Sequence, residues 1–361
     1  VEVMMITGDH PRTASRIASD LGIGGAAPEV TTGHALRHVD DPDELARRVA
    51  ATDVFARVEP ADKLAIVRSL QAQRHVTAMT GDGVNDAPAL RQADLGVAMG
   101  VTGSEVAKDA SDMILADDNF ATILRAVREG RELFANIRKF LRYLLASNAG
   151  EVLVVVLGVV LASPLGLDAA GMDGELAVPL LATQILWINL MTDSALALAL
   201  GVDSAIDDVM ARPPRRVGER VVDGRMMMTI ALVGTTTALA GLIAFDLELE
   251  GGLLGGSGDV ATARTMVFTT LVLAQVANAF NARSDRASAF VGLFRNRLLW
   301  GAAALTVAGQ VLVVHLRPLG SAFDTEPLSI GQWAICVGLA STVLWVEEIR
   351  KLIGRWLSRS R

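Results

Sequence analysis

Polar and apolar positions alternate regularly in the part of the chain before Tyr143. Short apolar runs that end in Thr or Gly are separated by amphipathic stretches whose apolar residues recur with a helical period. We predict strands at residues 3–7, 54–57, 76–80, 95–99 and 113–115, and helices at 11–21, from 41 onward, at 61–73 and after 85. This order is typical of βαβ units, so we expect an α/β domain with a parallel sheet over residues 1–125.

A second pattern begins at Asn119, where a helical period runs without a breaker into the apolar stretch that starts at Tyr143. Further long apolar runs follow it. We predict six membrane helices, at about 141–161, 178–200, 226–245, 264–281, 298–316 and 330–349. Each is close to the ~20 residues that cross a hydrocarbon core of ~30 Å. Residues 126–361 are therefore expected to form a stalk and an all-α bundle of six transmembrane helices in the lipid bilayer.

The loops between the predicted spans alternate in charge. Arginine is concentrated at residues 201–225, at 281–297 and in the tail after 349, whereas acidic residues dominate the turns at 162–177, 246–263 and 317–329. Loops rich in Lys and Arg stay on the cytoplasmic side of a membrane. We therefore predict a multi-pass protein of the cell membrane in which the soluble part and both ends of the six-span unit are cytoplasmic.

Composition agrees with two regions in different solvents. Of the 361 residues, 51% are hydrophobic and only 20% are charged, which is too apolar for an ordinary soluble domain. The formal net charge of −7 argues against a nucleic-acid partner. Cys336 is the single cysteine, which excludes an intrachain disulfide framework and a CxxC metal site. Because Val1 opens an apolar run without a basic region or an initiator Met, we expect the sequence to belong to a longer chain.

Acidic and amide side chains follow the predicted strand at residues 76–80. The run is Thr80-Gly81-Asp82-Gly83-Val84-Asn85-Asp86-Ala87-Pro88. Ligands bind α/β sheets at the carboxyl ends of their strands, and hard carboxylate oxygens suit Mg²⁺ next to a phosphate. A structural Asp/Asn/Gly-rich turn is the alternative, and it would be favoured for three residues alone. The length of the run favours a functional site.

Two further segments carry groups that suit a phosphate. Thr7-Gly8-Asp9 ends the first predicted strand and offers a hydroxyl, backbone N–H groups and a carboxylate. Lys63 follows Glu59-Pro60 at a helix start, where a cation can neutralise a transferring phosphoryl group. Taken alone, Lys63 has about even odds of being a solvated surface lysine. The neighbouring motifs favour a phosphoryl-transfer site.

Polar side chains also lie within three of the predicted spans, where they are costly and thus candidates for function. They are Asn148 and Glu151 in the first span, Asn189, Thr192 and Asp193 in the second, and Gln275 and Asn278 in the fourth. A dehydrated Ca²⁺ takes about six to eight oxygen ligands of this kind. Soft metals are disfavoured because no Cys or His is among these groups. Hydrogen bonding between helices is the structural alternative.

Several segments closely resemble the HAD-like Rossmann phosphorylation domain of P-type ATPases, in order and in spacing. They are residues 5–9, residues 55–60 with Lys63, and residues 80–88. Residues 116–120 and 212–215 are similar to the subgroup of sarco/endoplasmic-reticulum-like calcium pumps, and the resemblance covers essentially the whole chain. It implies part of an ATP-driven Ca²⁺ exporter that forms an aspartyl phosphate, with Mg²⁺ as cofactor and ATP as substrate.

The resemblance also implies residue roles. Asp82 would bind Mg²⁺, and Thr7 and Lys63 would contact the phosphoryl group. Gly8, Asp9, Asn85 and Asp86 would line and order the same site. In the membrane, residues 147–151 and 186–193 are similar to the fifth and sixth helices of the calcium pumps. This implies a transported-cation site formed by Asn148, Glu151, Asn189, Thr192, Asp193 and Gln275.

Three features of the sequence bear on how far the resemblance extends. Asn189 favours calcium over sodium/potassium relatives, which use an acid there, and Gln275 stands where two-site calcium pumps carry a glutamate. No Asp-Lys-Thr-Gly-Thr run occurs, so the phosphorylated aspartate is absent, and an N-terminal part of the same pump is the implied partner. We expect this chain alone neither to hydrolyse ATP by the family mechanism nor to pump. Mn²⁺, Na⁺ or H⁺ as the cargo, a soluble-headed phosphatase and a non-catalytic membrane remnant remain alternatives.

Overall fold

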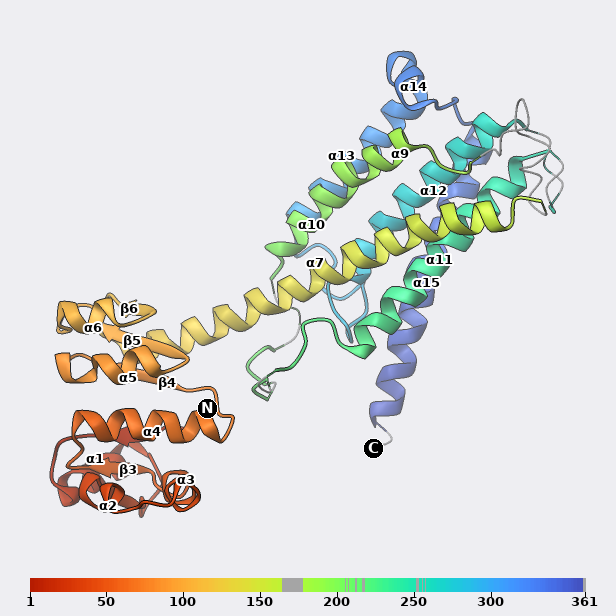
Figure 1. Ribbon diagram of the computed structural model, residues 1–361. Helices are drawn as coiled ribbons and strands as arrows, with labels where there is room; N and C mark the ends of the chain where they lie inside the picture. Colours follow the sequence, from red (N-terminus) through yellow and green to blue (C-terminus); the bar gives the residue numbers. More distant parts are fainter. Residues whose placement is uncertain are drawn as a thin grey trace. The chain divides into compact units, whose positions relative to one another are not determined.

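A computed structural model of the protein shows two compact units (Figure 1). It describes residues 1–163, 178–204, 206, 208–211, 213–215, 218–250, 253–254, 256 and 258–359. Most of the predicted acidic turn at 162–177, and parts of the loops at 201–225 and 246–263, lie outside these residues. One unit comprises Val1–Arg128 with Pro213–Glu219, and the other comprises Glu129–Arg212 with Arg220–Arg361.

The first unit contains two three-stranded parallel sheets. One has the order β1-β3-β2, formed by β1(Met5–Ile6), β3(Val54–Ala56) and β2(Val30–Thr32). The other has the order β4-β5-β6, formed by β4(Ala78–Gly81), β5(Leu95–Met99) and β6(Met113–Leu115). Within the described part of the chain, β1 pairs only with β3 and β4 pairs only with β5. Each therefore has one edge open to a further strand.

Short helices connect these strands. They are α1(Pro11–Leu21), α2(Gly33–Arg37), α3(Pro42–Ala50), α4(Pro60–Ala72), η1(Val84–Asp86), α5(Ala87–Gln92) and α6(Glu105–Asp109). Local sequence explains where they begin. The Asp41 side chain accepts a hydrogen bond from the N–H of Asp43, and Ser104 caps α6 through the N–H of Ala107. The βαβ alternation is confirmed, whereas β2, α2 and α6 were not among the predicted elements.

Helix α4 and strand β1 join the cores of the two sheets. Ile66 packs with Phe55 beside the first sheet, while the next residue, Val67, packs with Leu90 beside the second. Ile6 of β1 contacts both clusters. Successive residues of a helix point about 100° apart, so one helix can cover both clusters. This packing fixes the start of α4, where Lys63 lies.

Asp118 secures the loop after β5 to the segment between β6 and α7(Phe120–Val160). Its carboxylate accepts N–H groups from Gly100 at 2.6 Å, Val101 at 2.9 Å and Thr102 at 2.8 Å. The bond from Val101, with further bonds from Thr102 and Gly100, outweighs desolvation and lowers the pKa of Asp118 from 3.8 to about 2. These contacts therefore persist above that pH and are lost as the pH falls through about 2.

The second unit is a helix bundle. After α7 it contains α9(Ala182–Trp187), η2(Ile188–Asp193), α10(Ser194–Gly201), α11(Gly224–Glu248), α12(Val260–Asn281), α13(Arg297–His315), α14(Arg317–Phe323) and α15(Ile330–Arg359). Among the described residues, six helices are long and apolar enough to cross a membrane. The predicted class is thus confirmed: a partial parallel α/β domain followed by six apolar helices.

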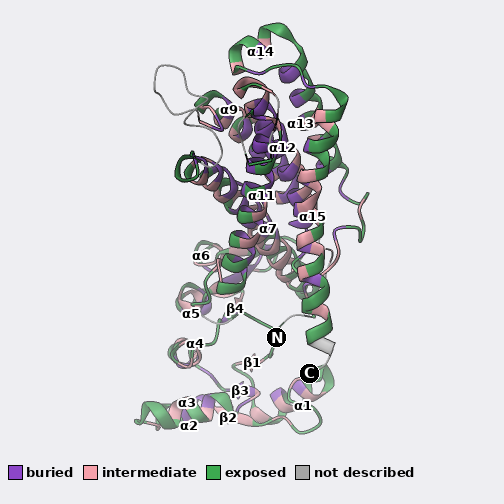
Figure 2. Cartoon of the chain, turned by 90° about the vertical axis from the view of Figure 1, so that its right-hand side faces the viewer, coloured by how far each residue is buried: buried purple, intermediate pink, exposed green. Residues whose placement is uncertain are grey.

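Helix α12 lies at the centre of this bundle. It packs against α11, α13 and α15, and Figure 2 shows it largely in the colour of buried residues. Residues from several helices meet in one apolar cluster around it, including Val154, Ile188, Phe245, Phe268 and Val313. The polar residues of α12, among them Gln275, are therefore shielded from the surroundings and must find partners inside the bundle.

Candidate functional site

A partly buried ion pair organises the carboxyl end of β4. Lys63 of α4 pairs with Asp86 through its Nζ and one carboxylate oxygen. The other oxygen of Asp86 accepts N–H groups from Asp82 at 3.3 Å and Gly83 at 3.2 Å. Asp86 is only 6% exposed, so its carboxylate is fully used in holding this loop and orienting the lysine. Asp86 positions the other groups of the site.

Asp82 and Asn85 differ from Asp86 because both are exposed. The backbone carbonyl of Asp82 accepts the N–H of Ser104 at 2.8 Å, which fixes the loop. In the described part of the chain, the Asp82 carboxylate has no hydrogen bond or ion pair, and neither has the Asn85 amide. An exposed carboxylate on a fixed backbone, with an amide nearby, fits Mg²⁺, which prefers oxygen ligands and retains several waters.

Thr7, Gly8 and Asp9 form a separate turn after β1. The Thr7 hydroxyl accepts the N–H of Asp9 at 3.1 Å, and a backbone bond from Arg57 to the Asp9 carbonyl ties this turn to the one after β3. A Cβ added at Gly8 would meet nothing within 4 Å, so the space above the turn is open. Among the described residues, no hydrogen bond or ion pair joins this turn to the side chains of Lys63, Asp82 and Asp86. The structure therefore gathers the predicted residues into two sets.

Gly81 leaves room for the Asp86 side chain. A Cβ at Gly81 would lie 2.6 Å from the Cβ of Asp86, whereas one at Gly83 would lie 3.6 Å from an Asp86 oxygen, which is an ordinary contact. Gly81→Ala is therefore expected to push Asp86 away from Lys63 and to destabilise this loop by about 1–3 kcal/mol. Hydrogen exchange of the Asp82 N–H measures the effect. Gly83→Ala is the matched control, and equal exchange in both variants would contradict the prediction.

A second polar cluster lies inside the helix bundle and joins α7, η2 and α12. Gln275 donates a hydrogen bond from its Nε2 to Glu151 Oε1 at 2.7 Å. Asn148 donates from its Nδ2 to an Asp193 oxygen at 3.4 Å. Glu151 and Asp193 are each 4% exposed and lie within electrostatic reach of each other. Among the described residues neither carboxylate has a cationic side-chain partner, and the two form the centre of this cluster.

Several buried oxygen atoms without a hydrogen-bond partner belong to residues of this cluster or to their neighbours in the chain. Among the described residues they include Tyr143 Oη, Ser147 Oγ, Thr192 Oγ1, Asp193 Oδ1 and Gln275 Oε1. The Tyr143 hydroxyl lies near Asp193 and Ser147 without forming a bond of good geometry. Buried polar atoms are normally paired, so such a group needs an explanation. Several hard oxygens around two carboxylates match the preference of a dehydrated Ca²⁺ or a similar cation.

A π-helical turn places the η2 residues. The second predicted span is not a continuous α-helix, because residues Ile188–Asp193 adopt π-helical geometry between α9 and α10. The wider turn leaves the neighbouring residues Thr192 and Asp193 both buried, at 0% and 4% exposure. Such turns are rare and often occur at functional sites. Asn189 is placed differently: its Nδ2 bonds to the carbonyl of Ile185 in its own helix, at 3.1 Å.

Sequence reasoning missed two residues of this cluster, Tyr143 and Ser147. Both are buried on α7, at 0% and 2% exposure. The signal was present, since residues 143, 147 and 151 are spaced by four and therefore share one helix face. Asn278, noted in the sequence, lies one turn beyond Gln275 and has an unpaired Nδ2 among the described residues.

Comparisons with known proteins find relatives for both the α/β part and the helical part of the chain. Residues 1–94 match the family of haloacid dehalogenase-like hydrolases, and residues 177–353 match the family described as cation transporting ATPase, C-terminus. The calcium-transporting ATPase of Bacillus subtilis is 41% identical over 345 residues, which are 94% of this chain and 36% of that protein.

Two other relatives show the same relation. The probable cation-transporting ATPase F of Mycobacterium tuberculosis is 40% identical over 98% of this chain and 38% of its own length. The human calcium-transporting ATPase type 2C member 1 is 37% identical over 98% of this chain and 37% of its length. The chain thus spans well under half the length of the curated relatives it matches. It belongs to the P-type cation-transporting ATPases and corresponds to their C-terminal region.

Proposed function

We propose that this chain contributes the ion-binding membrane region, and part of the phosphoryl-transfer site, of an ATP-driven pump that exports Ca²⁺. The observation that carries the proposal is the buried cluster of Glu151, Asp193 and Gln275 with its unpaired oxygens. Burying two carboxylates inside an apolar bundle is costly without a cation to compensate them. An ion-binding role explains both the carboxylates and the surplus of acceptors, and interhelical hydrogen bonding alone explains neither.

Ca²⁺ is the preferred cargo because of the ligand types. Carboxylate, amide and hydroxyl oxygens surround the site, and Ca²⁺ accepts about six to eight of them in irregular geometry. The amide nitrogen of Gln275 donates to Glu151, and its amide oxygen has no hydrogen-bond partner among the described residues. That oxygen is therefore available to a cation. Several relatives carry calcium transport in their names, while others are named only for cations. Mn²⁺, Na⁺ and H⁺ are the competing cargoes that the experiment below separates.

The first unit supplies part of the chemistry with ATP. We assign Mg²⁺ to the exposed Asp82 carboxylate with Asn85 close by, and contact with the phosphoryl group to Lys63 and Thr7. Bound Mg²⁺ would neutralise phosphate charge during transfer. Asp86 holds the Lys63 ammonium in place, so that the cation is positioned before the phosphate binds. The sequence does not contain the family's phosphorylation motif, Asp-Lys-Thr-Gly-Thr. The aspartate that accepts the phosphoryl group must therefore come from another segment.

The unpaired edges of β1 and β4 support the proposal that another segment, which carries the phosphorylated aspartate, packs against this unit. Both strands are parallel members of their sheets, and both end in Thr-Gly-Asp at their carboxyl ends. A strand that paired with both edges would extend the hydrogen bonding and bring its own carboxyl end to the same side. The orientation we propose places this unit, and both ends of the six-span bundle, in the cytoplasm, on the evidence of the arginine-rich loops.

A chimera tests the proposal. This chain would replace the matching C-terminal region of the Bacillus subtilis calcium-transporting ATPase, and ATP hydrolysis would be measured with Ca²⁺, Mn²⁺, Na⁺ or a pH step as the only variable. We expect stimulation by micromolar Ca²⁺. If a folded chimera were stimulated by another ion alone, the assignment of Ca²⁺ as the cargo would be contradicted. If its ATP hydrolysis depended on none of these ions, the proposal that the chain belongs to a cation pump of this kind would be contradicted. The unfused chain is expected to form no hydroxylamine-sensitive phosphoenzyme.

A further inference from the structure

The loop between α12 and α13, residues 282–296, exposes large apolar side chains. Phe290, Val291 and Phe294 are each half exposed or more, and Phe294 reaches 74%. Single apolar residues on a surface need no explanation, but several together form a patch, and such patches mark sites where a partner or a membrane binds. We call these three residues the loop patch. The proposed phosphoryl-transfer and cation sites use none of them.

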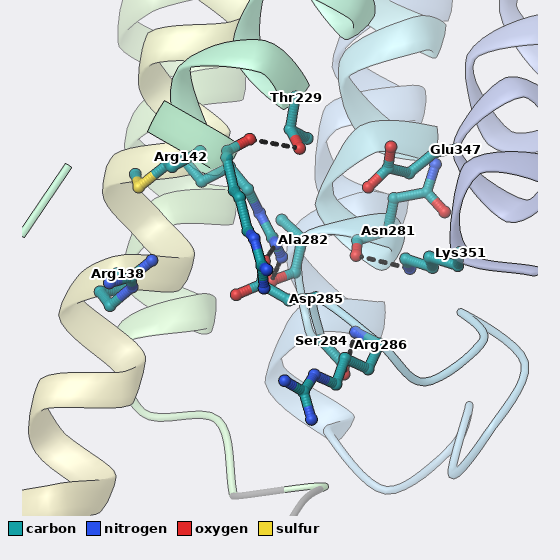
Figure 3. A network of polar contacts seen from close by, with 12 residues as sticks. Arg138, Arg142, Thr229, Asn281, Ala282, Ser284, Asp285, Arg286, Glu347 and Lys351 are labelled. Atoms are coloured by element: carbon teal, nitrogen blue, oxygen red, sulfur yellow. Dashed lines mark hydrogen bonds and ion pairs between the residues drawn. The ribbon is translucent and has the colours of Figure 1, made fainter. Parts of the chain in front are cut away.

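The loop is firmly held, so this exposure is built into the fold. Figure 3 shows its first residues next to α7 and α15: Arg142 pairs with Asp285, and Lys351 donates to the carbonyl of Asn281 at 3.0 Å. Three further hydrogen bonds hold the rest of the loop, from the Ala289 N–H to Glu348 at 2.6 Å, from Arg283 to the Gly292 carbonyl at 3.0 Å and from Trp300 to the Leu293 carbonyl at 2.9 Å. The loop patch therefore stays on the outside.

Ring contacts join the loop patch to two of the apolar helices. The ring centroid of Phe290 lies 6.2 Å from that of Trp345 on α15, and the Phe294 ring stacks on Trp300 of α13 with a centroid distance of 5.3 Å. Both tryptophans are themselves exposed. The loop patch thus continues onto the outer surface of α13 and α15, which is the surface that faces lipid in a membrane protein.

The lengths of these helices place the rings at the edge of the hydrocarbon core. Helix α13 has 19 residues, which span about 28 Å at 1.5 Å each, so nearly all of it is needed to cross a core of ~30 Å. Trp300, in its first turn, therefore lies at the boundary. On α15, the ~20 residues that cross the core from Ile330 already include Trp345. Because each tryptophan contacts one phenylalanine of the loop, the loop patch lies at the same depth.

We propose that the loop between α12 and α13 binds the lipid bilayer, with Phe290, Val291 and Phe294 inserted among the acyl chains just below the headgroups. Tryptophan collects at this level of membrane proteins, and the phenylalanine rings of the loop pack on two of them. Arg286 and Arg295 are exposed in the same loop and are long enough to reach the headgroups from this depth. A second copy of this chain is the competing occupant, but the loop patch is continuous with surfaces that face lipid.

Spin labels measure the depth of the loop in the full chain, reconstituted in phosphatidylcholine vesicles. Val291→Cys carries the label in the loop patch. Val337→Cys, exposed within the apolar part of α15, is the reference for hydrocarbon, and Val76→Cys, exposed in the first unit, is the reference for water. Cys336 is buried, and labelling of the parent chain gives its background. Power saturation with oxygen and with a water-soluble nickel complex reports contact with each solvent.

Nickel contact at Val291→Cys is expected to fall well below that at Val76→Cys, while oxygen contact rises toward that at Val337→Cys. Phe294→Cys should give the same result, and it keeps the test valid if the first label disturbs the loop. Nickel contact equal to that at Val76→Cys would show that the loop lies in water and would overturn the proposal.

Low contact with both reagents would also overturn it, because protein would then cover the loop patch. Spin–spin broadening between labels on different chains would identify that protein as a second copy. The inference rests on the membrane helices and on none of the pump chemistry. Its test needs no ATP hydrolysis, so its outcome is independent of the proposed function.

Discussion

Glu151→Gln and Asp193→Asn are each expected to lower the Ca²⁺ affinity of ATP hydrolysis in the chimera by roughly thirtyfold or more. Both carboxylates are buried and have no cationic side-chain partner in the described cluster, so an ion bound between them would be their main source of compensation. Removing one partner of a desolvated charge pair costs about 2–5 kcal/mol, and 2 kcal/mol corresponds to roughly thirtyfold. The Ca²⁺ concentration that gives half-maximal stimulation measures this loss.

Glu248→Gln is the matched control. Glu248 also lies on a helix of the bundle, but it bonds to Gln332 at 2.9 Å and takes no part in the central cluster. Its variant should keep the Ca²⁺ dependence of the parent chimera. If Glu151→Gln and Asp193→Asn behaved like this control while folding normally, the cation site would have to lie elsewhere. Gln275→Glu would add a third carboxylate beside Glu151, which makes a useful extension of the same measurement.

Asp82→Asn is expected to lower phosphoenzyme formation in the chimera by roughly a hundredfold or more. Metal binding to a transferring phosphoryl group contributes several kcal/mol, and about 1.4 kcal/mol corresponds to tenfold in rate. The substitution keeps the size of the side chain and leaves the backbone bond from Ser104 intact, so the fold should be preserved. Labelled ATP, followed by acid quench and hydroxylamine treatment, measures the phosphoenzyme.

Glu105→Gln provides the control in the first unit. Glu105 is an exposed carboxylate whose one ion pair among the described residues is with Lys108 on its own helix, so its loss should leave phosphoenzyme formation unchanged. Raising the Mg²⁺ concentration should partly restore Asp82→Asn, because a weakened metal site fills at higher concentration. Full activity of Asp82→Asn at low Mg²⁺ would remove Asp82 from the metal role.

Much of the fold could be predicted because the apolar pattern is strong. Residues 95–99 and 113–115 form the strands expected from their apolar runs; the first strand is almost wholly buried, and the second buries Leu115. The strand Val30–Thr32 was missed because it is short and only half buried, which leaves little apolar signal. The division into two sheets also could not be foreseen, because pairing between strands depends on contacts far apart in the chain.

The membrane site was predictable in its residue types and less so in its connections. Glu151, Asp193 and Gln275 stood out because polar groups in apolar spans are costly. Which group bonds to which depends on how the helices pack, so the bond from Gln275 to Glu151 could not be read from spacing within either helix. Asn189 illustrates the same limit, because its amide bonds within its own helix. The π-helical turn carries no pattern that hydropathy detects.

That turn also has a genetic consequence. A π-helix closes its hydrogen bonds one residue later than an α-helix, so Ile188–Asp193 acts like a one-codon insertion in an otherwise regular span. Deleting an apolar codon there would barely alter hydropathy. The deletion would convert the π-helical turn to α-helical geometry and leave the helices on either side of it in register. A change that barely alters hydropathy would thus decide which residue of the turn faces Glu151, while the rest of the span keeps its place.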